Sequence, residues 1–148
     1  MAVPDIRHLA DRLEIDDLLT RYTRAIDTGE WDRLDAVFTP EARIDYTASG
    51  GIAGAYPEVK AWLAKVLPMF PKRQHVIAQR EVELEGDRAR VTAYFLNPMV
   101  MSRPDAADEL WEFGGYYHHR LVRTDAGWRS EELVEEIVWK RTPGAPAS

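Results

Sequence analysis

The feature that most constrains the fold is a change in the spacing of apolar residues close to Pro71. Before that point, apolar side chains recur every three or four residues, which predicts helices. After it, apolar and polar side chains alternate, which predicts half-buried strands. A chain that forms its helices first and its strands afterwards indicates an α+β domain, with the helices packed on one face of a curved antiparallel or mixed sheet.

Three helices and a short strand are predicted in the first half. The first helix covers residues 6–27 and is ended by Gly29, a residue type that readily takes a positive φ. A short helix at 31–37, a short strand at 43–46 and a third helix at 57–67 follow. The apolar face of the first helix comprises Leu9, Leu13, Ile15, Leu18, Leu19, Tyr22 and Ile26.

The second half is predicted to form a meander of four antiparallel strands. These strands cover residues 76–84, 89–100, 110–123 and 128–140. The pair Gly114-Gly115 falls inside the third strand and marks a bend, because glycine within a strand often accompanies a bulge. A sheet bent around the helices makes a cone that leaves a pocket at its open end. The inner face is predicted to carry Trp31, Phe38, Tyr46, Trp62, Phe70, Phe95, Met99, Trp111, Phe113 and Tyr117.

Composition excludes several classes of protein. The chain has 148 residues, so we expect one domain over 1–148, with a Pro/Gly-rich tail at 142–148 that frays. It has no cysteine, which excludes disulfides and thiolate metal sites. Its net charge is −6, and basic and acidic residues are interspersed along the chain without an extended basic tract. We therefore expect no nucleic acid partner. No apolar run approaches the roughly 20 residues of a membrane span, and residues 1–5 do not resemble a signal peptide, so we expect a cytoplasmic location without membrane contact.

Asp27 and His75 are the main candidates for chemistry. Asp27 lies in the last turn of the first helix, where a carboxylate meets the unfavourable end of the helix dipole. It is either functional or a cap for the helix that follows. His75 opens the first long strand and is either structural or a base. A carboxylate that accepts the Nδ1 proton of a histidine leaves Nε2 as a base near neutral pH.

Two tyrosines and an apolar wall complete the predicted site. The hydroxyls of Tyr22 and Tyr46 would bind or protonate a substrate oxygen, unless both side chains are simply part of the core. The substrate-binding wall is predicted to comprise Trp62, Phe95, Met99, Phe113 and Tyr117. His118 and His119 are adjacent in a strand, so at most one of them faces the interior. The sequence has no metal-ligand spacing and no glycine-rich phosphate loop, so neither a metal nor a cofactor is expected.

The chain resembles the SnoaL-like and scytalone-dehydratase-like proteins of the nuclear transport factor two-like superfamily. The resemblance covers nearly the whole chain. The motifs that carry it are Ile15-x-x-Leu18-Leu19-x-Arg21-Tyr22-x-x-Ala25-Ile26-Asp27, Trp31-Asp32-x-Leu34, Phe38-Thr39-x-Glu41-Ala42, Gln74-His75, Gly114-Gly115-x-Tyr117 and Gly127-Trp128-Arg129. The order and spacing of these motifs in the chain are similar to those of bile-acid dehydratase, scytalone dehydratase and hexachlorocyclohexane dehydrochlorinase.

The resemblance implies a cone-shaped α+β barrel and an elimination enzyme that needs no cofactor. It places the Asp–His base at Asp27 and His75, and catalytic tyrosines at Tyr22 and Tyr46. The dehydrochlorinase has a lysine where this chain has Tyr22, and an arginine in the last strand near Leu133. This chain has neither. That difference favours loss of an oxygen leaving group, or an enolising reaction, over loss of chloride.

Three functions are consistent with these residues. The first is a dehydratase-type lyase acting on a small apolar ring compound such as a steroid, terpenoid or polyketide. The second is an isomerase similar to ketosteroid isomerase, or a polyketide cyclase, which would use the same pocket. The third is a binding or subunit-like module without catalysis, because a fold does not fix a function. We also expect a homo-oligomer, either a dimer or a trimer.

Overall fold

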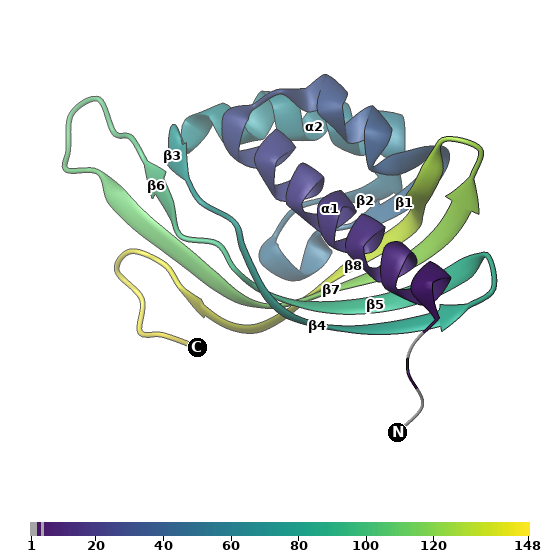
Figure 1. The fold of residues 1–148 in the computed structure, drawn as a ribbon. Coiled ribbons are helices and arrows are strands. Elements are labelled where there is room, and N and C mark those ends of the chain that lie inside the picture. The colour runs from purple at the N-terminus through teal and green to yellow at the C-terminus, as the bar shows by residue number, and fades with distance from the viewer. Residues whose placement is uncertain (1–2, 4) are drawn as a thin grey trace.

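A strongly curved sheet holds the helices in its concave face (Figure 1). The computed structural model describes residue 3 and residues 5–148. Residues 1, 2 and 4, which belong to the segment expected not to be a signal peptide, lie outside the described residues. In chain order the elements are α1 (Ile6–Thr28), the 3₁₀ helix η1 (Trp31–Ala36), β1 (Phe38–Asp45), η2 (Thr47–Ser49), β2 (Ala53–Ala55), α2 (Tyr56–Val66), η3 (Leu67–Met69), β3 (Lys72–Arg73), β4 (Val76–Glu85), β5 (Arg88–Leu96), β6 (Met99–Met101), β7 (Glu109–Thr124) and β8 (Gly127–Arg141).

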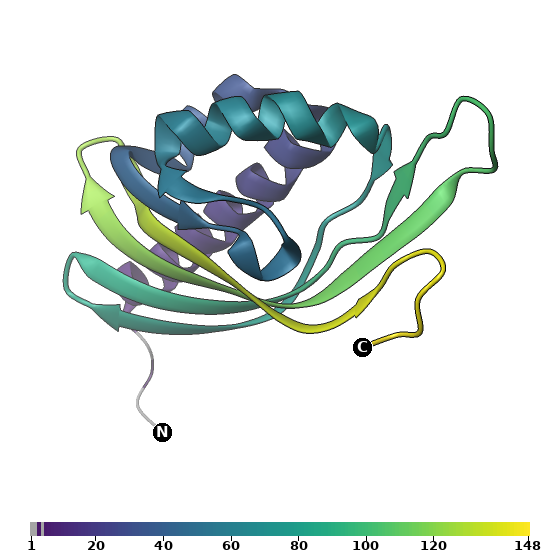
Figure 2. The ribbon, with the colours of Figure 1, turned by 180° about the vertical axis from the view of Figure 1, so that it is seen from behind.

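The predicted meander is confirmed and forms most of the sheet. Strands β4, β5, β7 and β8 lie side by side and antiparallel, in that order. Beyond the prediction, β1 pairs in parallel with β8, and β2 pairs with β1, so the sheet is mixed. The strand predicted at 89–100 is broken at Asn97 and Pro98, and β6 then pairs with β3 and β7. Figure 2 shows α2 lying across the concave side above β1 and β2.

The bend predicted at Gly114-Gly115 is confirmed as a register shift between β7 and β8. A Cβ atom on Gly115 would lie 1.9 Å from the carbonyl oxygen of Glu136, so only glycine allows β8 to approach so closely. The bulge curves the two longest strands around the helices. This curvature creates the concave side on which the site lies.

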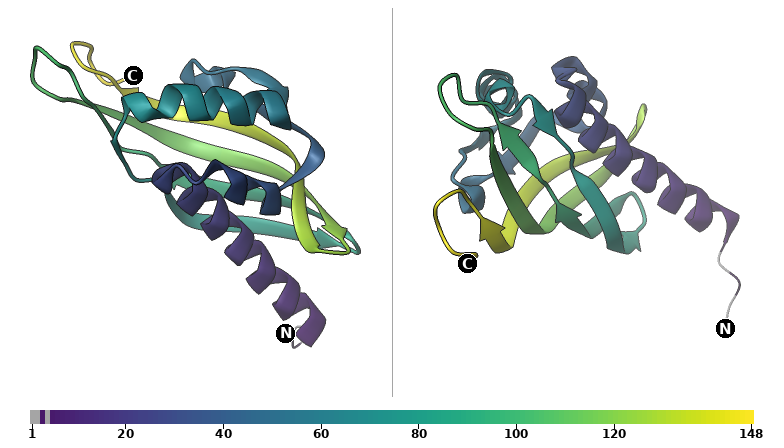
Figure 3. Two further views of the ribbon diagram at one scale, coloured as in Figure 1. Left: turned by 90° about the horizontal axis from the view of Figure 1, so that it is seen from above. Right: turned by 90° about the vertical axis from the view of Figure 1, so that its left-hand side faces the viewer.

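Helix α1 matches the predicted helix and ends where predicted. Gly29 caps it with φ 73°, and its N–H bonds to the carbonyl oxygen of Ala25 at 3.1 Å. Leu9 and Leu13, however, were wrongly placed on the buried face, because both are exposed. The start of α1 passes beyond the edge of the sheet (Figure 3). There the inward side chain is Asp11, which pairs with Arg123 at 2.8 Å.

The core lies between the helices and the concave face of the sheet. All ten large side chains predicted for the inner face belong to the core or pack against it. Residues 142–148 turn back so that Ser148 exchanges backbone hydrogen bonds with Lys140. The fraying of this tail stays a prediction. No helix in the described part of the chain is long and apolar enough to cross a membrane.

Candidate active site

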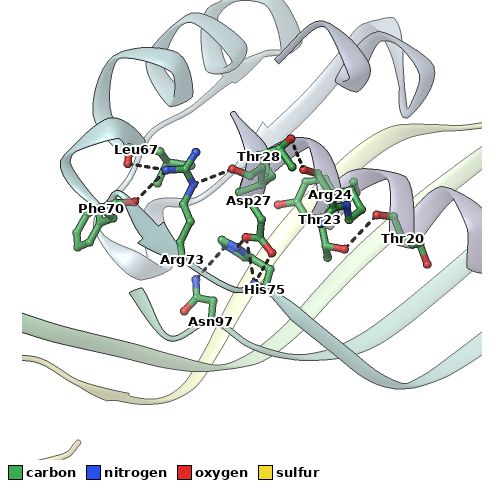
Figure 4. A network of polar contacts seen from close by, with 12 residues as sticks. Thr20, Thr23, Arg24, Asp27, Thr28, Leu67, Phe70, Arg73, His75 and Asn97 are labelled. Carbon is green, nitrogen blue, oxygen red and sulfur yellow. Dashed lines mark hydrogen bonds and ion pairs between the residues drawn. The ribbon is translucent and has the colours of Figure 1, made fainter. Parts of the chain in front are cut away.

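Asp27 and His75 meet where the end of α1 approaches the start of β4 (Figure 4). The Oδ1 atom of Asp27 lies 2.7 Å from Nδ1 of His75. The backbone N–H of His75 also donates to the same carboxylate, with distances of 2.9 and 3.1 Å to its two oxygens. Asp27 is not the cap of the next helix. The N-cap position of η1 is Glu30, and no described side chain caps that helix.

This geometry sets which ring nitrogen of His75 carries the proton. An ionised carboxylate only accepts hydrogen bonds, so the contact with Asp27 places a proton on Nδ1 of His75. The Nε2 lone pair is then free to accept a proton. Both side chains are largely shielded, with exposed fractions of 6% for His75 and 16% for Asp27. The pair can therefore act as an oriented general base within a mostly dry environment.

Asn97 is a site residue that the sequence analysis missed. Its Nδ2 atom lies 3.4 Å from Nε2 of His75, which is long for a hydrogen bond and leaves that lone pair available to a substrate. The register of β4 on β5 pairs Val76 with Leu96, so the next residues outward are His75 and Asn97. The register set by the turn would place His75 opposite Pro98, and the irregularity between Ile77 and Arg80 shifts it by one residue to bring Asn97 beside the base.

Arg73 holds the surrounding elements in place. Its guanidinium donates to the carbonyl oxygens of Ile26 at 2.7 Å, Phe70 at 2.9 Å and Leu67 at 3.2 Å (Figure 4). These three bonds connect the last turn of α1 to the segment that follows α2. Because Ile26 immediately precedes Asp27, Arg73 fixes the backbone that carries the carboxylate.

The two predicted tyrosines touch each other inside the cone. The hydroxyls of Tyr22 and Tyr46 lie 2.7 Å apart, and both side chains are buried. Burial raises the pKa of both hydroxyls, and of Tyr117, well above the usual value. All three hydroxyls therefore remain protonated at any physiological pH. In the Tyr22–Tyr46 pair one hydroxyl donates to the other, and Tyr117 is a further hydrogen-bonding neighbour of Tyr22.

A cavity joins the tyrosines to His75. Tyr22, Tyr46, His75 and Asn97 all line it, with a volume of about 160 Å³. Of the predicted apolar wall, Trp62, Met99, Phe113 and Tyr117 line the cavity. Phe95 was wrongly predicted to line it. Its ring stacks on Tyr117 with centroids 4.0 Å apart and lies behind that side chain, so it supports the wall without forming it.

Glu135 is the second site residue that the sequence analysis missed. It lines the cavity from β8 and is only 6% exposed. Burial raises the pKa of Glu135 to about 7, and the neighbouring Ser49 partly offsets that rise. Along β8 the buried side chains alternate, with Leu133 before Glu135 on the same face. This alternation could have identified Glu135 from the sequence, because a glutamate at an inward position of a strand is unusual.

The other two histidines lie away from the cavity. His118 is on the outer face, with Nε2 2.6 Å from Glu136. His119 is buried against Ser130, with 2.9 Å between Nδ1 and the hydroxyl oxygen. Burial lowers the pKa of His119 to about 3, so its ring is neutral. The prediction that at most one of the two faces inward is confirmed. Within the described residues, no group of three or more potential metal ligands converges.

The comparisons with known proteins confirm the predicted family and fold. The chain belongs to the SnoaL-like domain family, which matches residues 7–134. Rv2910c, an uncharacterised protein of Mycobacterium tuberculosis, is 44% identical over 136 residues, covering 92% of this chain and 91% of that protein. The Kfla4162 protein from Kribbella flavida has a similar structure, with TM-score 0.81 and 26% identity over 89% of this chain and 93% of that one. Hexachlorocyclohexane dehydrochlorinase LinA-type3 from Novosphingobium barchaimii superposes with TM-score 0.79 and 18% identity, covering 97% of each chain.

Proposed function

We propose that this protein is a lyase of dehydratase type that needs no cofactor, with His75 as its general base and Asp27 orienting that base. The observation that carries the proposal is the 2.7 Å contact between Nδ1 of His75 and Oδ1 of Asp27 at the edge of a largely apolar cavity. A carboxylate that holds the Nδ1 proton of a histidine orients the ring and leaves Nε2 as the nitrogen that accepts a proton.

The proposed reaction begins at a carbon atom next to a carbonyl group. Nε2 of His75 removes a proton from that carbon, and the electron pair moves onto the carbonyl oxygen. A hydroxyl of the Tyr22–Tyr46 pair donates a hydrogen bond to that developing oxyanion. When the electron pair returns, a carbon–carbon double bond forms and the hydroxyl on the next carbon leaves.

The cavity supports a small ring as the reacting part of the substrate. A volume of about 160 Å³ is close to that of a cavity that holds one benzene molecule. Its lining is mainly apolar, but three polar atoms there lack partners among the described residues: Oδ1 of Asn97, Nε1 of Trp111 and Oε1 of Glu135. A ring from a steroid, terpenoid or polyketide that carries a carbonyl and a hydroxyl would satisfy such atoms. LinA-type3, which shares the fold, is by name an elimination enzyme.

The test is turnover of β-hydroxycyclohexanone, followed by the ultraviolet absorbance of the cyclohexenone formed. Wild-type protein dialysed against a chelator should produce the enone. His75→Ala should lower the rate by about 10²–10⁴-fold. His118→Ala is the matched control, because that histidine lies on the outer face, and its rate should not change. Conversion of the β,γ-unsaturated isomer of cyclohexenone to the conjugated enone, without turnover of β-hydroxycyclohexanone, would instead indicate an isomerase. No turnover would favour the binding module.

A further inference from the structure

The Glu135 carboxyl has no task in the proton removal described above, yet it occupies a defined place in the same cavity. On β8 it is paired directly across from Tyr117 on β7, and both side chains point to the concave side. Tyr22, Tyr46 and Tyr117 line the same cavity, and the charge of Glu135, when present, raises the pKa of each of them. Glu135 therefore lies on the tyrosine side of the cavity.

One oxygen of this carboxyl is free to meet a ligand. Among the residues that the structure describes, Oε1 of Glu135 has no hydrogen-bond partner, although the residue is 94% shielded from solvent. A buried polar atom without a partner is costly, so a ligand group that hydrogen-bonds to Oε1 would be stabilised there. With burial raising the pKa of Glu135 to about 7, the carboxyl holds a proton in a large fraction of molecules near neutral pH.

The remaining lining shows what kind of leaving group this carboxyl suits. The described residues that line the cavity include no lysine and no arginine, so no fixed positive charge is available to receive a departing anion. A halide leaves as an anion without needing a proton. A hydroxyl group leaves readily only when it is protonated and departs as water.

We propose that Glu135 is the acid that protonates the hydroxyl group as it leaves the substrate as water. This rests on the proposed elimination. His75 takes the proton from carbon and becomes charged. The carbon–oxygen bond breaks, its electron pair stays on oxygen, and that oxygen takes the proton of Glu135 to form water. Water in the cavity then returns the proton from His75 to Glu135, so no co-reactant is consumed.

The experiment compares two substrates that differ only in the leaving group. β-Hydroxycyclohexanone and β-chlorocyclohexanone both give cyclohexenone, and spontaneous loss is subtracted for each. Glu135→Gln keeps the size of the side chain but cannot transfer a proton. It should lose about 10²-fold or more on the hydroxyl compound and remain within a few-fold of wild type on the chloride. Glu136→Gln, at the next position on the outer face, is the matched control and should match wild type on both.

The outcomes separate this assignment from the proposed function. Equal losses on both compounds in a Glu135→Gln variant that keeps the wild-type melting temperature would overturn the acid role and leave the base standing. If the wild type converts the chloride but not the hydroxyl compound, the acid role is likewise overturned and the base still stands. Turnover of neither compound by the wild type would overturn the elimination itself, and the acid role with it. Partial recovery of the hydroxyl rate in Glu135→Asp, with no change on the chloride, would support the assignment.

Discussion

The carboxylate of Asp27 binds His75 through both the ring and the backbone. One oxygen contacts Nδ1 at 2.7 Å, and the two oxygens share the backbone N–H at 2.9 and 3.1 Å. The contact with the backbone fixes where β4 begins, and the contact with the ring fixes how the imidazole is turned. Two segments 48 residues apart are thereby joined at the point where the cavity needs a base.

Replacing Tyr22 tests the oxyanion contact. Tyr22→Phe removes one hydroxyl of the 2.7 Å pair and should lower kcat on β-hydroxycyclohexanone by about 10²–10³-fold, or less if Tyr46 compensates. The effect should fall on kcat rather than KM, because the contact strengthens only as charge develops. Tyr94→Phe, on the outer face, serves as the control. An unchanged kcat in Tyr22→Phe would show that this hydroxyl serves only the core.

Replacing Arg73 tests how the site is held. Arg73→Met keeps most of the side-chain stem but leaves the carbonyl oxygens of Ile26, Leu67 and Phe70 without their charged donor. Hydrogen bonds to charged groups are worth about 1.5–3 kcal/mol, so the free energy of unfolding should fall by roughly 2 kcal/mol or more. Arg33→Met removes only an exposed ion pair with Glu30 and should cost less than about 1 kcal/mol. Equal losses in urea unfolding would contradict the holding role.

The sequence predicted the fold and the Asp27–His75 pair for identifiable reasons. The change of period near Pro71 separates helices from strands, and Gly29 and Gly115 mark places that tolerate few other residues. The pair depended on the family resemblance, because spacing in sequence cannot show that two residues 48 positions apart touch.

The errors in the site have physical causes as well. Alternation places Phe95 on the inner face but cannot show that Tyr117 covers its ring. Asn97 and Glu135 are polar, so the apolar pattern that predicts the wall of the cavity does not include them. The position of Glu135 was nonetheless implied, since it shares a face with Leu133. Asn97 reaches His75 only through the register shift between Ile77 and Arg80, which the sequence does not show.

Glu135 should make stability depend on pH. Burial raises its pKa from 4.5 to about 7, so the folded protein holds a proton that the unfolded chain releases between these values. The stabilisation is complete below about pH 4.5, declines as the pH rises and is lost above about 7. The change is on the order of 3 kcal/mol. Asp45 and Ser49 also face this carboxyl and belong to the same environment.

Urea unfolding of wild type and Glu135→Gln at several pH values measures this effect. The wild type should lose stability relative to the variant between pH 5 and pH 8.5. Taking the difference removes the opposite contribution of His119, whose pKa is lowered by burial to about 3 and which costs stability as the pH falls below 6.5. Parallel curves for the two proteins would show that Glu135 ionises as freely in the folded state as in the unfolded one.

The outer face of the sheet bears on assembly. Val134, Val138 and Trp139 are exposed there, with Tyr116 half-buried beside them. Soluble monomers rarely expose a continuous apolar patch, so we predict a homo-oligomer, with a dimer and a trimer both consistent. Sedimentation at micromolar concentration should give a mass well above the 16.9 kDa of one chain, and Trp139→Glu should lower it. A single species at 16.9 kDa would rule the oligomer out.

The most direct test of the central claim is a double-mutant cycle on Asp27 and His75, measured as kcat/KM for β-hydroxycyclohexanone. Asp27→Asn and His75→Ala should each lower it by about 10²–10⁴-fold while circular dichroism shows the fold intact. Because the two side chains act as one unit, the double mutant should lose little more than the worse single mutant. Losses that multiply would mean that the two residues act independently. Full activity in His75→Ala would contradict the account, because it would leave either Asp27 alone as the base or no catalysis by this pair.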